Sequence, residues 1–370
     1  MVSIAFTGGG TGGHIYPGLA VISSLKELIS CRIFWIGSDS GMDRAIVEGA
    51  GIEFFGIPSG KLRRYFSFKN VSDIFRIMAG YFAARKILKR EKAAFLFSKG
   101  GFVSVPPCAA ASSLKIPVFS HESDYSPGLA TRINARFSNK IFIPYRESIK
   151  FFKDKVKRKL SVSGNPIRPE FAGADPAKGR TFLGLGDNER ILLILGGSLG
   201  SREINELTAD SLLELTRHYT VVHQYGEANA SDIAVCENHR YKPYAYFRDE
   251  IPHIIAAAEI VLCRSGAGTI WECKYLKKPM VLVPLRGSGT RGDQVENARL
   301  FEESGAAVSF IPDSEENNSG KSSREALCAL IASLAEDPKR RKAMGDAEVA
   351  EREAAPFIAD EILKIIKSNI

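Results

Sequence analysis

Short runs of hydrophobic residues alternate along this chain with longer segments in which hydrophobic residues recur at helical spacing. Such runs predict strands, and the segments between them predict helices. We expect strands at residues 2–6, 32–36, 94–97, 117–119 and 140–143 in the first half, and at residues 191–195, 220–223, 260–263 and 280–283 in the second. The last segment, residues 357–370, again has helical spacing. The pattern predicts an α/β fold.

Each half of the chain opens with a predicted strand, a glycine-rich turn and a predicted helix. The turns are residues 8–13 (GGGTGG) and residues 196–201 (GGSLGS). A strand–turn–helix unit brings backbone N–H groups and a helix N-terminus onto an anionic group, and glycine lets that group approach closely. Two such halves predict two domains that face each other across a cleft, with ligands beyond the carboxyl ends of the strands.

The first glycine turn also fits the dinucleotide-binding fingerprint GxGxxG, read from Gly8. That fingerprint needs an acidic residue at the end of the second strand to bind a ribose, and Asp39 is roughly in this position. A tight turn without a ligand is an equally good interpretation of the glycines alone. His14 adds a group that titrates near neutral pH to a loop that otherwise only binds charge.

Composition adds few constraints. The 370 residues suit two domains, and residues 164–166 (GNP) form the expected hinge. With 45% hydrophobic and 25% charged residues the chain has ordinary soluble composition, and we expect no membrane span and no signal peptide. The six cysteines form no CxxC pair, which favours reduced thiols in the cytoplasm. No HExxH motif or DxD-type carboxylate pair indicates a catalytic metal.

The net charge of +8 favours an anionic partner. Basic and aromatic residues are interleaved over residues 61–90, which suits a surface that rests on anionic lipid. The residues that we assign to this membrane surface are Arg63, Arg64, Phe66, Phe68, Lys86 and Lys89. A helix with its apolar face in the core and its charges in solvent fits the same pattern. Nucleic acid is not expected as a partner, because no known reading motif accompanies the charge.

Three further clusters follow predicted strands: residues 97–104 (FSKGGFVS), 121–124 (HESD) and 263–269 (CRSGAGT). His121 taken singly is better explained as a core histidine that bonds a neighbour. Arg264 and the helix N–H groups after it suit a diphosphate. Glu272 lies about one helical turn beyond Thr269 and is placed to accept both hydroxyls of a ribose. In the alternative, Ser265 caps the helix and Glu272 is solvated.

At these residues the chain resembles the MurG family of N-acetylglucosaminyltransferases over nearly its whole length. Seven motifs in the family's order carry the resemblance: GGGTGGHIYPGLA, FSKGGFVSVP, HESD, GNPIR, GGSLGSREIN, CRSGAGTIWE and DQVENA. The resemblance implies a GT-B fold, with two Rossmann-like domains whose parallel sheets face a central cleft. It implies an N-terminal acceptor domain of residues 1–164 plus 356–370, and a C-terminal domain of residues 165–355 that binds UDP-N-acetylglucosamine (UDP-GlcNAc).

The implied activity is the step that completes lipid II in peptidoglycan synthesis. N-acetylglucosamine passes from UDP-GlcNAc to lipid I (undecaprenyl-pyrophosphoryl-MurNAc-pentapeptide), with no cofactor, at the cytoplasmic face of the cell membrane. The implied donor-binding residues are Thr11, Gly12, Gly13, Asp124, Arg168, Ser198, Phe247, Arg248, Arg264, Ser265, Gly266, Ala267, Gly268, Thr269, Glu272 and Gln294. The implied acceptor-binding residues are Gly10, Thr11, His14, Tyr16, Lys99, Gly100 and His121.

Four positions depart from the family. Ser123 and Asp124 stand where the family commonly has glutamine and asparagine (HEQN), Leu199 where glutamine is common, and Arg248 where an aliphatic residue is frequent. These departures leave open a related transferase that glycosylates another lipid. A UDP-sugar epimerase on the same two-domain plan and a nonenzymatic nucleotide-sugar or lipid-binding protein are the other open classes.

We expect a metal-independent single displacement that inverts the anomeric carbon. A base must remove the proton of the acceptor C4 hydroxyl, and His14 is the first candidate, with Glu122 as the second. Arg264, Ser198 and helix N-terminal amides are expected to stabilise the leaving UDP in place of a metal.

Overall fold

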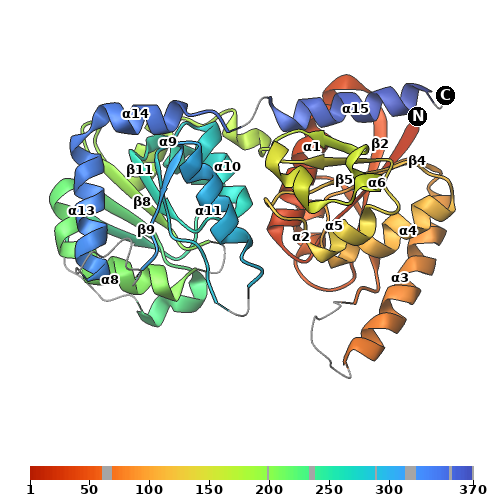
Figure 1. The fold of residues 1–370 in the computed structure, drawn as a ribbon, viewed down its shortest axis with the longest axis horizontal. Helices are drawn as coiled ribbons and strands as arrows, with labels where there is room; N and C mark the ends of the chain where they lie inside the picture. Colours follow the sequence, from red (N-terminus) through yellow and green to blue (C-terminus); the bar gives the residue numbers. More distant parts are fainter. Residues whose placement is uncertain are drawn as a thin grey trace. The chain divides into compact units, whose positions relative to one another are not determined.

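The structure is a computed structural model that describes residues 1–60, 69–197, 200–232, 238–287, 290–312, 322–349 and 352–368. The predicted site residues Arg63, Arg64, Phe66, Phe68 and Ser198 lie outside this described part. The chain divides into two compact units, which we call unit 1 (Met1–Arg168 with Ala350–Ile370) and unit 2 (Pro169–Val349). Each unit is a parallel sheet covered by helices, so the predicted α/β class is confirmed (Figure 1).

Unit 1 contains a seven-stranded sheet in the order β3-β2-β1-β4-β5-β6-β7, and its described strand pairs are all parallel. The strands are β1 (Val2–Thr7), β2 (Cys31–Ser38), β3 (Glu53–Ile57), β4 (Ala93–Ser98), β5 (Val118–His121), β6 (Lys140–Ile143) and β7 (Leu160–Val162). The sequence predicted five of these seven. It missed β3 and β7, which are the two edge strands and carry weaker hydrophobic runs.

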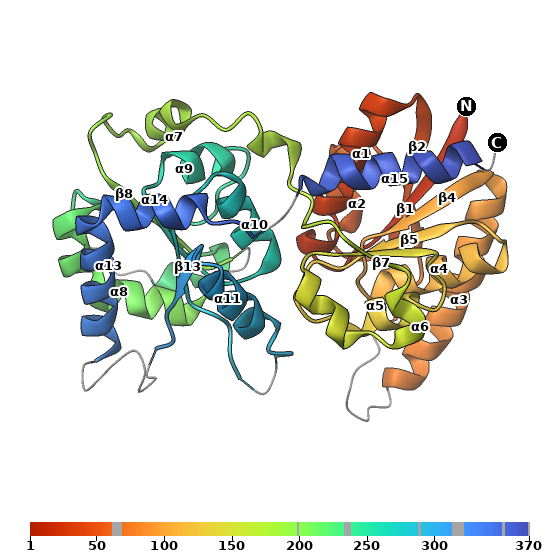
Figure 2. The same ribbon diagram turned by 45° about the horizontal axis from the view of Figure 1, so that its top comes forward.

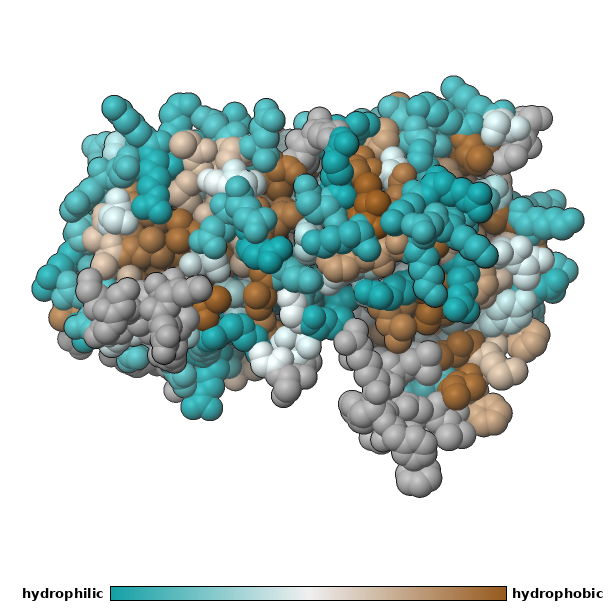
Figure 3. All heavy atoms as spheres, in the orientation of Figure 1, coloured by the Kyte–Doolittle hydropathy of each residue, from teal (hydrophilic) through white to brown (hydrophobic). Residues whose placement is uncertain are grey.

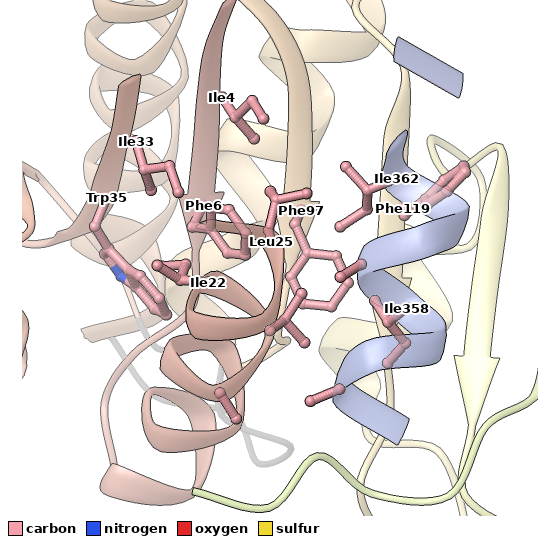
Figure 4. Close-up of a cluster of buried hydrophobic side chains, with 14 of the residues drawn as sticks. Ile4, Phe6, Ile22, Leu25, Ile33, Trp35, Phe97, Phe119, Ile358 and Ile362 are labelled. Atoms are coloured by element: carbon pink, nitrogen blue, oxygen red, sulfur yellow. The ribbon is translucent and has the colours of Figure 1, made fainter. Parts of the chain in front are cut away.

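The helices of unit 1 cover both faces of its sheet. They are α1 (Tyr16–Leu28), α2 (Asp43–Gly49), α3 (Lys69–Arg90), α4 (Val105–Ser113), α5 (Leu129–Asn134), α6 (Asp154–Lys157) and α15 (Ala354–Ser368), with 3-10 turns η1 (Gly12–His14), η2 (Phe102–Ser104) and η3 (Arg146–Phe151). The C-terminal helix α15 packs beside α1, where Ile358 and Ile362 reach the layer of Phe97 and Phe119 (Figure 4). The end of the chain therefore completes the core of unit 1.

Unit 2 contains a six-stranded sheet in the order β10-β9-β8-β11-β12-β13, and its described strand pairs are also parallel. The strands are β8 (Ile191–Leu195), β9 (Thr220–Gln224), β10 (Tyr241–Tyr244), β11 (Ile260–Cys263), β12 (Met280–Leu282) and β13 (Ala307–Ser309). The sequence missed the edge strands β10 and β13. Pro243 lies in β10, which is tolerated there because an edge strand leaves one row of N–H groups unpaired.

The helices of unit 2 pack on the same plan. They are α7 (Pro176–Leu183), α8 (Arg202–His218), α9 (Ile251–Ala257), α10 (Ala267–Tyr275), α11 (Asp293–Glu303), α13 (Ser323–Glu336) and α14 (Pro338–Asp346), with 3-10 turns η4 (Pro169–Phe171) and η5 (Glu227–Asp232). Helices α8 and α13 lie side by side over one face and close a core with strands β8, β9 and β11 (Figure 2).

Both sheets have a topological switch point. The chain order reverses between neighbouring strands β1 and β4 in unit 1, and between β8 and β11 in unit 2. Loops that leave the carboxyl ends of such a strand pair run apart and open a crevice, where ligands of α/β proteins bind. The loops at these two points are residues 8–15 with 99–104, and residues 196–201 with 264–266.

Candidate functional site

The first glycine loop is shaped by a buried carboxylate that sequence analysis missed. Asp43 is fully buried, and its Oδ1 accepts the N–H of Gly10 at 2.9 Å while its Oδ2 accepts the N–H of Ser38 at 3.1 Å. Gly10 has φ +87°, and a Cβ on Gly9 would lie 1.9 Å from Asp43 Oδ2. The loop therefore needs glycine at both positions, and Asp43 fixes its path.

Asp39, the acidic residue of the dinucleotide alternative, is engaged elsewhere. Its Oδ1 pairs with Nη2 of Arg76 on α3 at 3.2 Å, and its side chain is exposed. The carboxylate that would have to bind the ribose of a dinucleotide is thus paired with Arg76 at the protein surface. This placement weakens the dinucleotide interpretation of the glycines.

His14 lies where the loops after β1 and β4 meet. It ends η1 and is half-buried. A Cβ on Gly101 would lie 3.0 Å from His14 Cδ2, and a Cβ on Gly100 would lie 3.9 Å from His14 Nδ1. Both glycines have positive φ, so the second loop presents bare backbone to the imidazole. The exposed residues Gly10, Thr11 and Gly13 lie in the same loop as His14.

Lys99 follows β4 and is 1% exposed, so its side chain points into the protein. Its Nζ donates to Ser123 Oγ at 2.5 Å. Burial lowers the pKa of Lys99 to about 8, although the charges of Glu122 and Asp124 oppose this shift. A direct contact with the acceptor, which the resemblance implied, stays a prediction. The geometry gives the ammonium a partner within the protein.

Glu122 has the environment of a structural carboxylate. Its Oε1 accepts the N–H groups of Ser123 and Asp124, and its Oε2 accepts the N–H of Gly128 and the hydroxyl of Thr131. These four bonds engage both oxygens, and the side chain is buried. A carboxylate held in this way suits the positioning of a turn better than proton transfer.

Two further predicted residues of unit 1, His121 and Arg168, contact parts of the chain that are distant in sequence. His121 is fully buried and its Nε2 lies 3.0 Å from the carbonyl of Gly164; burial and the charge of Lys99 hold its pKa well below the usual range. The guanidinium of Arg168 lies over the ring of Tyr16, with its Cζ 5.0 Å from the ring centroid. Arg168 is thus the last residue of the first segment of unit 1, and the contact with the donor that the resemblance implies stays a prediction.

In unit 2, helix α10 begins with an open N-terminus. Gly266 is its N-cap, and among the described residues no side chain caps the helix. Ser265, which the alternative placed as the cap, instead donates from Oγ to the carbonyl of Gln294 at 2.7 Å. The alternative is therefore wrong for Ser265. The first N–H groups of α10, at residues 267–269, form the kind of terminus that binds an anion.

Arg264 holds together the loops next to this helix terminus. Its Nη1 pairs with Glu203 Oε2 at 2.6 Å, its Nη2 donates to Ser201 Oγ at 2.6 Å, and its side chain is only 11% exposed. Ser201 is also the N-cap of α8, where its Oγ accepts the N–H of Ile204. The guanidinium thus connects the two loops at the switch point, and a contact with a diphosphate stays a prediction.

Gln224 connects two predicted donor segments and was missed by sequence analysis. It is buried at the end of β9, where its Nε2 donates to the carbonyl of Gly197 at 3.1 Å and its Oε1 accepts the N–H of Phe247 at 3.0 Å. Arg248, next to Phe247, is exposed. A single amide therefore sets the spacing between the second glycine turn and the segment of Phe247.

The remaining donor candidates lie near the same end of the sheet. Glu272 is half-buried on α10, and Gln294 of α11 accepts the N–H of Leu285 through its Oε1 at 3.0 Å. The part of the chain that the structure describes contains no cluster of three or more His, Cys, Asp or Glu side chains able to hold a metal ion.

Helix α3 presents a hydrophobic face to solvent. Ile74, Phe75, Met78 and Phe82 are 51%, 69%, 53% and 63% exposed. Their spacing places them on one side of the helix, and brown spheres gather over this region at the lower right of Figure 3. The opposite side, with Ala84 and Leu88, packs into the core. The interpretation that all apolar residues of this segment face the core is wrong for these four residues.

Comparisons with known proteins give the family. Residues 4–143 match the model of the glycosyltransferase family 28 N-terminal domain, and residues 191–361 match that of the family's C-terminal domain. The chain belongs to glycosyltransferase family 28. Both family domains include a switch point with its glycine turn, so the family assignment covers the candidate loops of each unit.

Curated relatives in the family share one description. The proteins of Treponema denticola (48% identity, 83% of each chain) and Clostridium novyi (44% identity, 85% of this chain and 87% of that one) are both named UDP-N-acetylglucosamine--N-acetylmuramyl-(pentapeptide) pyrophosphoryl-undecaprenol N-acetylglucosamine transferase. The resemblance to the MurG family stated from the motifs is confirmed at this level of identity.

Solved structures agree on the fold. MurG of Acinetobacter baumannii superposes with a TM-score of 0.72 at 23% identity, over 98% of this chain and 100% of that one. The UDP-GlcNAc 2-epimerase of Neisseria meningitidis superposes with a TM-score of 0.70 at 15% identity, over 98% and 100%. The predicted GT-B fold is confirmed. Because an epimerase has nearly the same score, the fold alone does not distinguish transfer from epimerisation.

Proposed function

We propose that this protein transfers N-acetylglucosamine from UDP-GlcNAc to the C4 hydroxyl of the muramoyl sugar of a lipid-linked acceptor, undecaprenyl-pyrophosphoryl-MurNAc-pentapeptide. The observation that carries the proposal is the 48% identity, over 83% of both chains, to a relative named for this transfer. The product is the disaccharide-linked lipid of peptidoglycan synthesis. The departures at Asp124, Leu199 and Arg248 make the identity of the acceptor the first point to test.

Unit 2 holds the donor in this proposal. The open N-terminus of α10 receives the diphosphate, because its partial positive charge and its first N–H groups, which have no partner within the helix, favour an anion. Glu272, about one turn later, accepts the ribose hydroxyls, and the segment of Phe247 and Arg248 lies beside the uracil. Arg264 acts indirectly, because its contacts with Glu203 and Ser201 fix the loops that touch the donor.

Unit 1 holds the acceptor and supplies the base. The C4 oxygen attacks the anomeric carbon as its proton passes to His14, and the bond from that carbon to the UDP oxygen breaks with the electron pair leaving on UDP. Attack opposite to the leaving group inverts the anomeric carbon. The position of His14 at the β1–β4 switch point supports this assignment, and the four bonds of Glu122 favour a positioning role for that residue.

The reaction needs no metal in this proposal, because the N-terminus of α10 stabilises the charge that grows on UDP. Transfer is expected to continue in excess EDTA at an unchanged rate. Loss of transfer in EDTA that Mg²⁺ or Mn²⁺ restores would contradict this part of the proposal.

We further infer that the protein works at the cytoplasmic surface of the membrane. Among the described residues no helix is long and apolar enough to cross a bilayer. The exposed hydrophobic side chains of α3, next to Lys86 and Lys89, suit insertion into an interface of anionic lipid. The same surface would bring unit 1 to a lipid-linked acceptor.

Turnover of UDP-GlcNAc with and without the lipid-linked acceptor tests the proposed function. Release of UDP only when the acceptor is present supports transfer. Conversion of UDP-GlcNAc without acceptor would identify an epimerase, and binding without any turnover would identify a nonenzymatic binding protein.

A further inference from the structure

A buried lysine directly follows strand β4, next to the two glycines that border His14. Lys99 is 1% exposed, and an ammonium group removed from water is unfavourable unless other interactions compensate. Burial lowers the pKa of Lys99 to about 8, although the charges of Glu122 and Asp124 oppose this shift. A buried ammonium that directly precedes the two glycines bordering His14 is a candidate for a functional role.

The two hydrogen bonds that begin at Lys99 have a fixed donor-to-acceptor direction. Nζ of Lys99 donates to Ser123 Oγ at 2.5 Å, and Ser123 Oγ donates its own proton to Asn165 Oδ1 at 2.7 Å. Because the hydroxyl has one proton and gives it to Asn165, it offers only a lone pair to Lys99. These two hydrogen bonds, which we call the Lys99 relay, join the carboxyl ends of β4 and β5 to the segment that follows β7.

The relay acts on the turn that carries Asp124. Glu122 holds this turn through the N–H groups of Ser123 and Asp124, at 2.9 and 3.2 Å, and Lys99 holds it through the hydroxyl of Ser123. On its other side Lys99 is tied to β1, because its backbone N–H donates to the carbonyl of Thr7 at 2.7 Å. Gly100 and Gly101, the next two residues, are those that border His14.

We propose that Lys99 is a positioning residue of the acceptor side, which holds the turn of Ser123 and Asp124 and the segment of Asn165 in register with the loop of His14. This inference rests on the proposed function, in which unit 1 binds the acceptor. It differs from direct binding, because the ammonium contacts the protein. It also differs from a purely structural role, because a structural role requires Lys99 to stabilise the fold.

Three variants separate these roles: Lys99→Met, Ser123→Ala and the double variant. Methionine keeps most of the length of the side chain and removes the buried charge, so Lys99→Met should leave Tm unchanged or raise it. Ser123→Ala leaves the ammonium without its acceptor and should lower Tm. In the double variant Tm should recover, because the uncompensated charge is gone.

Transfer kinetics test whether Lys99 matters for the reaction. Both single variants should lower kcat with the lipid-linked acceptor by about 10- to 100-fold, as expected for a displaced site loop, with the KM for UDP-GlcNAc within about twofold of the unmodified protein. The double variant should be no slower than the slower single variant by more than about threefold. Lys155→Met, at an exposed lysine of α6, is the matched control and should match the unmodified protein in both Tm and kcat.

Hydrogen exchange provides a readout that does not depend on the acceptor. In Lys99→Met the N–H groups of residues 122–128 should exchange about tenfold faster while the core strands β1 and β4 are unchanged. A failure of the unmodified protein to transfer sugar would overturn the proposed function, and the exchange result would still decide whether Lys99 orders this turn. Lys99→Met with kcat within twofold of the unmodified protein, or with unchanged exchange at residues 122–128, would overturn the inference. So would a Tm that falls by several degrees in Lys99→Met.

Discussion

At the scale of single residues, the surroundings of His14 depend on the glycines that lie next to its imidazole. His14 lies against Gly100 and Gly101, whose positive φ angles and missing side chains leave room for the ring. A Cβ on Gly101 would lie 2.5 Å from the carbonyl of Gly9, so the loops after β1 and β4 are in close contact. The half-buried imidazole is therefore bordered by backbone of both loops.

Removal of this imidazole tests its role as the base. General bases contribute about 10²- to 10⁴-fold, so His14→Ala should lower kcat by a factor in this range. UDP binding, measured by calorimetry, should be nearly unchanged, because the proposed nucleotide site lies in unit 2. The acidic limb of the pH–rate profile should disappear with the titrating group.

The exposed His239 offers a matched control, and His239→Ala should leave the kinetics unchanged. A His14→Ala variant with normal kcat and an unaltered pH profile would exclude His14 as the base.

Glu272 is the residue that tests the donor site. Glu272→Ala should weaken binding of UDP-GlcNAc by about 1.5–3 kcal/mol, the usual contribution of hydrogen bonds to a charged group, which is about a 10- to 100-fold rise in KM. Glu272→Gln should lose less, since the amide oxygen still accepts one bond. An unchanged KM in Glu272→Ala would remove this residue from the donor site.

At the scale of elements, the central strands could be predicted from sequence because they are continuous hydrophobic runs buried on both faces. The edge strands β3, β7, β10 and β13 could not, since they are short or carry polar residues and are stabilised by pairing with a neighbour. The glycine turns could also be predicted from local sequence, because each one directly follows a hydrophobic run that predicts a strand.

The bracing residues of the site could not be predicted, because their partners are distant in sequence. Asp43 bonds Gly10 across 33 positions, Lys99 bonds Ser123 across 24 and Gln224 bonds Phe247 across 23. Only the folded sheet brings such pairs together. The motifs indicated which loops matter, but not which side chains hold them in place.

Gln224 tests whether the spacing of two loops matters for donor binding. In Gln224→Glu the carboxylate still accepts the N–H of Phe247 but faces the carbonyl of Gly197 without a proton to donate. The KM for UDP-GlcNAc should rise about tenfold, with a smaller change in kcat.

Asn238→Asp is the matched control for this prediction. The Asn238 amide also makes two bonds, to Arg240 N and Thr216 Oγ1, but at the amino end of β10. It should leave KM unchanged. Equal effects of the two variants would indicate general destabilisation of unit 2.

At the scale of the whole molecule, the proposal assigns a separate role to each unit and a membrane contact to helix α3. Unit 1 contains the proposed base and the exposed hydrophobic face of α3, and unit 2 contains the open helix terminus proposed for the diphosphate. In this proposal the protein combines a membrane-bound acceptor with a soluble donor.

The face of α3 can be tested with vesicles that contain anionic lipid. The paired change Phe75→Ser and Phe82→Ser should weaken vesicle binding at least about tenfold, because each aromatic ring contributes apolar area to the interface. Lys86→Glu with Lys89→Glu should weaken binding more at low salt than at high salt. Turnover of a soluble, short-chain acceptor analogue should be kept in both.

Leu213→Ser, at a residue of α8 in unit 2 that is 68% exposed, is the control and should bind vesicles normally. Full vesicle binding by the Phe75/Phe82 variant would show that α3 is ordinary solvated surface.

The most direct test of the central claim is the structure of the sugar product. The purified protein is incubated with UDP-GlcNAc and the lipid-linked muramoyl acceptor, and the product is analysed by mass spectrometry and by NMR of the new glycosidic linkage. We predict one added N-acetylglucosamine, joined to the C4 oxygen of the muramoyl sugar with β configuration, the inverse of the α-linked donor. An α linkage, another attachment site, or an epimerised UDP-sugar with the acceptor unchanged would contradict the account.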